Sequence, residues 1–177
     1  MDKELTMKQF AVAAVIGLAL VAGGCSKDNG PSTVKPTFTA ELRTSNEVPP
    51  IQNAEAGGTG QATITFDVTR DAAGNVTAGT ATFVVTLANF PAGTPINIAH
   101  IHENVAGANG PVIFSTALAA GEVTLANGGG SFTKTGIAPP DPAVFQRIIN
   151  NPAGFYFNAH STLNPGGVVR GQLVKVQ

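Results

Sequence analysis

The sequence predicts a single all-β domain, a Greek-key β-sandwich with one short helix near residues 141–150. Three features of the chain lead to this expectation. Apolar and polar residues alternate along most of the chain after residue 37, clusters of glycine, proline and asparagine interrupt the alternation at fairly regular intervals, and only one segment has helical spacing. Many short strands separated by regular turn signals are typical of sandwiches and of barrel-like sandwiches.

The clearest strand signal is the alternation of Ile64, Phe66 and Val68 with polar neighbours. Side chains point alternately to the two faces of a strand, so this spacing predicts one buried and one solvated face. The turn residues at 71–75 then predict a hairpin with the following segment. By the same reasoning, strands are expected at 38–44, 60–69, 80–87, 96–102, 112–116, 122–125, 130–135, 154–160 and 168–176.

One segment is predicted to be a helix. Asp141 can cap its first turn, and Pro142 suits the first helical position because the N–H that proline lacks would have no partner there. The Asn-Pro pair at 151–152 ends the segment. Between these ends lies an apolar stripe with helical spacing, which consists of Val144, Phe145, Ile148 and Ile149.

The N-terminal segment differs from the rest and predicts export. A short basic start at Lys8 is followed by an apolar run over 11–22. This run is shorter than the roughly 20 residues that span a bilayer, and it fits the apolar region of a secretory signal peptide. Small residues at 22–24 then precede Cys25, the only cysteine of the chain. The arrangement is similar to the bacterial lipobox, in which the cysteine is lipidated and becomes the new N-terminus.

These features divide the chain into a lipoprotein signal peptide at 1–24, a flexible tether at 25–36 and one β domain at 37–177. Acyl chains on Cys25 would hold the protein on a membrane, since each buried methylene contributes about 0.8 kcal/mol. The expected location is the cell envelope, and the outer membrane in a Gram-negative cell, because Ser26 rather than an aspartate follows the cysteine. An ordinary secreted protein with one unpaired thiol is the alternative.

Charge and sequence patterns disfavour several function classes. The chain has 10 basic and 11 acidic residues and a net charge of −1, so it lacks the basic surface that nucleic-acid binding needs. No serine lies in the Gly-x-Ser-x-Gly pattern of a hydrolase. Ser161 follows His160, but neighbouring strand residues point to opposite faces, which disfavours a nucleophile–base pair. No enzymatic activity is therefore expected.

The three histidines are the candidate functional residues. His100 and His102 lie two apart in a predicted strand and so share one face, and His160 ends a later strand. If these strands are neighbours, three imidazoles converge, which is a common arrangement around a copper or zinc ion with an open position. Glu103 and Asn158 are the nearest candidates for a fourth ligand. The alternative is that the histidines are structural and donate hydrogen bonds to loop carbonyls.

Five motifs occur along the domain in a fixed order: NEVPP at 46–50, AHIH at 99–102, GANGPV at 107–112, YFNAHS at 156–161 and RGQL at 170–173. Together they resemble the CHRD domain, a module first described in chordin and found widely in bacterial exported proteins. The resemblance implies an immunoglobulin-like or superoxide-dismutase-like β-sandwich, and it carries over no enzymatic activity. One departure is that Val168 and Val169 precede Arg170 where the family has Glu-Ile, so a glutamate partner for Arg170 is missing there.

The leading expectation is a lipid-anchored, non-enzymatic binding or structural module with an unknown protein or glycan ligand. The alternative is an envelope protein that binds copper or zinc on His100, His102 and His160, with Glu103, Asn158 and Arg170 in support. Copper–zinc superoxide dismutase also uses a His-x-His strand, but it needs more histidines and usually a disulfide. The three histidines and single cysteine therefore disfavour dismutase activity.

Overall fold

The computed structural model describes residues 34–177, which form an antiparallel β-sheet with one short helix, as expected. The signal peptide and Cys25 lie outside the described residues. No helix within 34–177 is long and apolar enough to cross a membrane. The strands are β1 (Thr37–Arg43), β2 (Thr59–Arg70), β3 (Val76–Ala88), β4 (Thr94–Glu103), β5 (Val112–Ser115), β6 (Val123–Leu125), β7 (Gly130–Ile137), β8 (Phe155–Ser161), β9 (Val169–Gln172) and β10 (Val174–Lys175).

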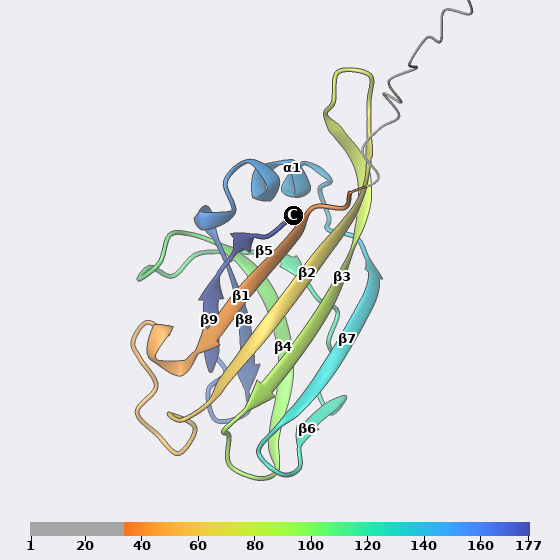
Figure 1. Ribbon diagram of the computed structural model, residues 1–177. Coiled ribbons are helices and arrows are strands. Elements are labelled where there is room, and N and C mark those ends of the chain that lie inside the picture. Colours follow the sequence, from red (N-terminus) through yellow and green to blue (C-terminus); the bar gives the residue numbers. More distant parts are fainter. Residues whose placement is uncertain (1–33) are drawn as a thin grey trace, which may run out of the picture. The chain divides into compact units, whose positions relative to one another are not determined.

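The strands follow the order β5-β4-β8-β9-β1-β2-β3-β7, while β6 pairs with β4 and β10 pairs with β1. In Figure 1, β1, β2, β3 and β7 form a wall in front of β4 and β8. Phe83 of β3 accordingly lies against Phe114 of β5 and Phe157 of β8, with ring centroids 5.3 Å and 6.3 Å apart. Strands that are distant in the sheet order therefore share one core.

The expected two-sheet sandwich is corrected to one curled sheet, a half-barrel. β9 pairs with β1 at Arg170 and Arg43, so the hydrogen-bonded ladder continues from one wall to the other. The right-handed twist between neighbouring strands rolls so wide a sheet onto itself. The alternation of the sequence determines which side chains are buried, but a curled sheet and a sandwich bury the same faces.

The predicted alternation holds in β2, where Ala62, Ile64 and Phe66 are fully buried. β8 is different because all 7 of its residues are buried. Its inner face contributes Phe157 to the core, while loops cover its polar outer face. This double burial places polar side chains in a protected position outside the core, and the candidate site lies among them.

The helix α1 (Ala143–Asn150) begins one residue after Pro142, which was the predicted first helical position. The Asp141 carboxylate accepts a hydrogen bond from the N–H of Ala143 at 2.9 Å. Phe145 inserts into the core and packs edge-on against Phe66, with ring centroids 4.8 Å apart. Figure 1 shows α1 at one end of the curled sheet. The helix therefore closes that end of the core.

The last predicted strand, 168–176, is two short strands, because the chain passes from β8 to β1 there. β9 pairs with β8, and β10 pairs with β1 after the buried Leu173. Two short 3₁₀ helices, η1 (Thr44–Asn46) and η2 (Pro152–Gly154), complete the described elements.

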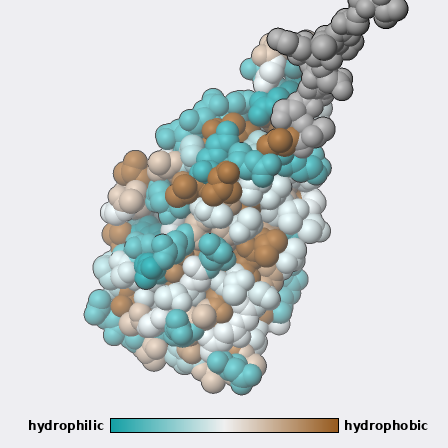
Figure 2. Space-filling model, viewed as in Figure 1, coloured by the Kyte–Doolittle hydropathy of each residue, from teal (hydrophilic) through white to brown (hydrophobic). Residues whose placement is uncertain are grey.

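In Figure 2 the apolar residues form small separated patches, so that face carries no continuous apolar band.

Candidate metal centre

The candidate centre lies on the outer face of two neighbouring strands, β4 and β8. His100 is paired with Asn158, His102 with Tyr156, and His160 with Ile98. Alternate residues of a strand share a face, so the three histidines project from the same side of the sheet. The adjacency on which the sequence prediction depended is therefore present in the fold.

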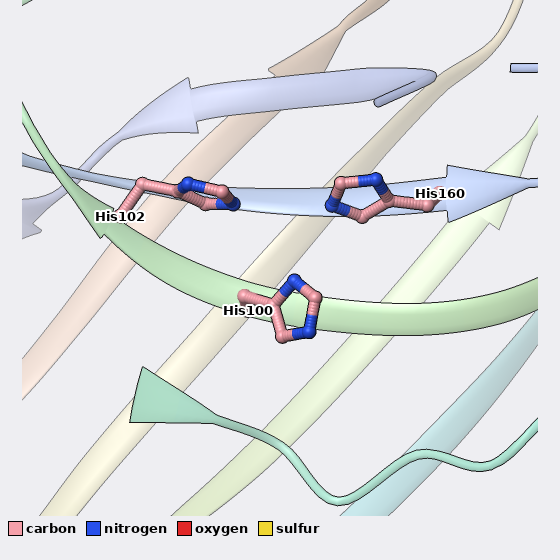
Figure 3. A group of neighbouring side chains, drawn as sticks. All are labelled: His100, His102 and His160. Carbon is pink, nitrogen blue, oxygen red and sulfur yellow. The ribbon is translucent and has the colours of Figure 1, made fainter. Parts of the chain in front are cut away.

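The three imidazoles face one another. One ligand nitrogen from each ring lies within 4.8 Å of those of the other two. The ring centroid of His100 is 5.7 Å from that of His102 and 5.1 Å from that of His160. Figure 3 shows a nitrogen of each ring directed to the space between them. The group thus has a common centre, although its members come from strands far apart in the sequence.

Hydrogen bonds to loop carbonyls fix the protonation of two rings. Nδ1 of His102 lies 3.0 Å from the carbonyl oxygen of Gly110, and Nδ1 of His160 lies 2.9 Å from that of Pro165. A carbonyl oxygen can only accept, so both Nδ1 atoms carry the proton. The Nε2 atoms, left with free lone pairs, are buried and have no hydrogen-bond partner among residues 34–177.

The surroundings keep the three histidines neutral. The pKa of His100 falls to about 4, chiefly through burial and then through the neighbouring His160 and His102. Burial also lowers the pKa of His102 and of His160, although each backbone hydrogen bond opposes the shift. Neutral imidazole is the form that binds a metal ion.

The geometry fits a first-row transition metal. Three atoms no more than 4.8 Å apart lie within about 2.8 Å of a common point, and zinc–nitrogen bonds are about 2.0–2.1 Å long. Each ring would need to move by less than an ångström. Metal-ligating histidines typically donate their other N–H to a carbonyl or carboxylate, as His102 and His160 do here.

The expected supporting residues occupy different places. Glu103 forms an ion pair with Arg147 at 3.1 Å and is not part of the histidine group. Asn158 is buried opposite His100, and none of the described residues forms a hydrogen bond with its Oδ1. Arg170 contacts the Tyr156 ring, with its guanidinium carbon 4.9 Å from the ring centroid. Asn158 and Arg170 thus border the centre, whereas Glu103 has another partner.

A buried polar network beside the histidines was not foreseen from the sequence. Tyr156 stacks on His102 with centroids 4.9 Å apart and the rings inclined by 8°, and Arg170 lies against the same tyrosine. Arg170 forms an ion pair with Glu47, whose side chain is only 5% exposed. Burial raises the pKa of Glu47 to about 7, although the charge of Arg170 opposes this.

The network lines a cleft of about 400 Å³ between the loops that follow β1 and β4. Arg170 joins these loops, because its Nε donates to the carbonyl of Asn46 and its Nη1 to that of Ala108. Glu47 is thus a carboxylate partner for Arg170 from a distant motif. The NEVPP motif at 46–50 marks Glu47 in the sequence, but nothing in the motif specifies which strand this loop covers.

Comparison with known proteins yields a family but no individual relative. No curated protein and no solved structure matches the chain. The model of the CHRD domain family matches residues 38–173. This range covers most of the chain and includes all three histidines, Glu47 and Arg170. The chain therefore belongs to the CHRD domain family.

Proposed function

We propose that this CHRD-domain protein is a lipid-anchored module of the cell envelope that binds one copper or zinc ion on His100, His102 and His160. The observation that carries the proposal is the convergence of three buried ring nitrogens that have no hydrogen-bond partner in the described part of the chain. A buried polar atom without a partner costs about 1–3 kcal/mol, which a bound cation would offset.

The two loop hydrogen bonds are also what a purely structural role for His102 and His160 would require. That role leaves both Nε2 atoms and the Nδ1 of His100 unexplained, because they are directed at one another rather than at a donor. A metal ion accounts for all three atoms at once. The geometry therefore favours metal binding over three bracing histidines.

Binding rather than catalysis is proposed. Ser161, the residue beside His160, donates to Glu55 at 2.5 Å and accepts from the backbone N–H of Asn164 at 3.0 Å. These bonds tie its hydroxyl to two loops, the one between β1 and β2 and the one between β8 and β9. Ser161 is thus a structural residue, and it offers no nucleophile to the histidines.

Metal content tests the proposal. The protein purified without chelators should contain about one equivalent of copper or zinc, and the His100→Ala/His102→Ala double variant should contain almost none. Val84→Ala, an exposed site on β3, is the matched control and should retain the metal. Substoichiometric metal in the wild type, with the same affinity in the double variant, would end the metal hypothesis.

The lipid anchor has a separate test. Cells fed labelled palmitate should label the wild-type chain and not Cys25→Ser, and the variant should leave the membrane fraction. Equal labelling of both chains would contradict lipidation at Cys25. The result does not depend on whether the domain holds a metal.

Binding of a peptide or glycan in the cleft is a second candidate function. Its support is the buried pair beside the cleft, since Glu47 Oε1 and Arg170 Nη2 have no hydrogen-bond partners within 34–177. Val105 is 61% exposed at the rim, so Val105→Asp should abolish binding to a glycan or peptide array without unfolding the domain. Val84→Asp on β3 should leave array binding intact. Equal binding by both variants would exclude the cleft as the site of peptide or glycan binding.

A further inference from the structure

The three histidines are not held in the same way. His102 and His160 are 8% and 6% exposed, and each donates a hydrogen bond from Nδ1 to a loop carbonyl. The ring of His100 is half-buried and makes no hydrogen bond within residues 34–177. Hydrogen bonds thus fix two of the ligands, and none among the described residues holds the third.

The carbonyls that hold the fixed ligands are themselves anchored. The N–H of Gly110 donates to the Tyr156 hydroxyl at 3.1 Å, and that tyrosine stacks on the His102 ring. The loop containing Pro165 is closed by Asn164, whose side-chain amide donates to Glu55 at 2.5 Å. Moving either fixed ring would break these hydrogen bonds, whereas turning His100 breaks only its ring contacts with His102 and His160.

This asymmetry matters because metal ions differ in the number of ligands that they need. Zinc takes four ligands in tetrahedral geometry, so losing a protein ligand weakens its binding strongly. Cu(I) also accepts two nitrogen ligands on opposite sides, which are then about 4 Å apart given bonds of about 2 Å. The facing nitrogens of the two fixed rings are no more than 4.8 Å apart, which is close to that separation.

We propose that His100 is the releasable ligand of the centre, so that His102 and His160 alone retain Cu(I) while a divalent ion requires all three histidines. This rests on the proposed metal-binding function. Release of His100 opens a coordination position on the more exposed side of the site without disturbing the hydrogen-bonded pair. The centre is thereby suited to exchanging Cu(I) with a second ligand.

The test compares affinities of the full-length chain in detergent micelles. Cu(I) is measured anaerobically against bathocuproine disulfonate, and Zn(II) against a chromophoric chelator. His100→Ala should weaken Zn(II) binding more than about 100-fold but Cu(I) binding less than about 10-fold. His160→Ala should weaken both ions more than about 100-fold. X-ray absorption of Cu(I)-loaded His100→Ala should show two nitrogen ligands.

Two outcomes distinguish a failure of the proposed metal binding from a failure of the proposal that His100 is releasable. If the wild type binds neither ion, the proposed function itself is wrong. If the wild type binds both but His100→Ala loses them by the same factor, the metal centre stands and the releasable ligand is refuted. The thermal unfolding midpoint shows whether each variant is folded, and His160→Gln replaces His160→Ala if the alanine variant is not.

Discussion

At the scale of single residues, the distinctive feature is a set of buried polar atoms on and beside the outer face of β4 and β8. Besides the histidine nitrogens, three atoms are buried without hydrogen-bond partners from the described residues: Glu47 Oε1, Asn158 Oδ1 and Arg170 Nη2. Folded proteins leave few such atoms, because each costs free energy. Their concentration beside three neutral imidazoles distinguishes this face from the rest of the sheet.

Close packing around Asn158 yields a stability prediction. A methyl group on Gly167 would lie 2.5 Å from Asn158 Nδ2 and 2.9 Å from Glu47 Oε2, and the residue has φ +132. Gly167→Ala should lower the free energy of unfolding by about 1–3 kcal/mol. The matched control is Gly166→Ala, where a methyl group meets nothing within 4 Å. Equal urea midpoints for the two variants would contradict this packing.

Glu47 should make the domain less stable as the pH rises. Burial raises the pKa of Glu47 from 4.5 to about 7 on folding, so between these values the folded state binds more protons than the unfolded state. The stability that Glu47 contributes is full below pH 4.5 and is lost as the pH rises through about 7.

The comparison with Glu47→Gln isolates this effect, because Arg170 and the histidines are present in both chains. From pH 4.5 to pH 8, the unfolding free energy of the wild type should fall relative to that of the variant by up to about 3 kcal/mol. Urea unfolding of both proteins at several pH values measures this difference in unfolding free energy. A difference that does not change with pH would show that the carboxyl keeps its ordinary pKa.

Part of the site was predictable at this scale. His100 and His102 share a face because they lie two apart in a strand, and this follows from the sequence alone. The loop carbonyls that orient His102 and His160 could not be foreseen, since any residue has a carbonyl and only the loop path brings one to Nδ1. The Glu47–Arg170 pair likewise depends on where a long loop folds back.

At the scale of elements, β8 connects the core to the site. Its inner face is apolar and its outer face polar, yet both are buried. The sequence predicted this strand, at 154–160, but not its burial on both faces, because the covering loops are remote in sequence.

Phe145 should be the residue on which α1 depends most. It is fully buried and lies edge-on to Phe66 and Phe114, with centroids 4.8 Å and 5.6 Å away. Phe145→Ala should lower the free energy of unfolding by about 3–5 kcal/mol. Asn150→Ala, at an exposed position of the same helix, should change it by less than about 0.5 kcal/mol. Similar unfolding curves for both variants would mean that α1 does not close the core.

At the scale of the whole molecule, the curled sheet explains why one face carries the site. The wall of β1, β2, β3 and β7 supplies the opposite side of the core, and β4 and β8 present their outer face to the covering loops. Strand positions and the helix were predictable from local patterns. The curl of the sheet was not predictable, because it depends on the pairing of β9 with β1, two strands that are far apart in the sequence.

The number of histidines that coordinate Cu(II) tests the central claim most directly. Pulsed electron paramagnetic resonance of the protein loaded with one equivalent of Cu(II) reports coordinated imidazoles. The geometry at His100, His102 and His160 predicts three in the wild type and fewer in His160→Ala. Copper that gel filtration removes, or a wild-type spectrum with one imidazole that His160→Ala leaves unchanged, would contradict a three-histidine metal centre.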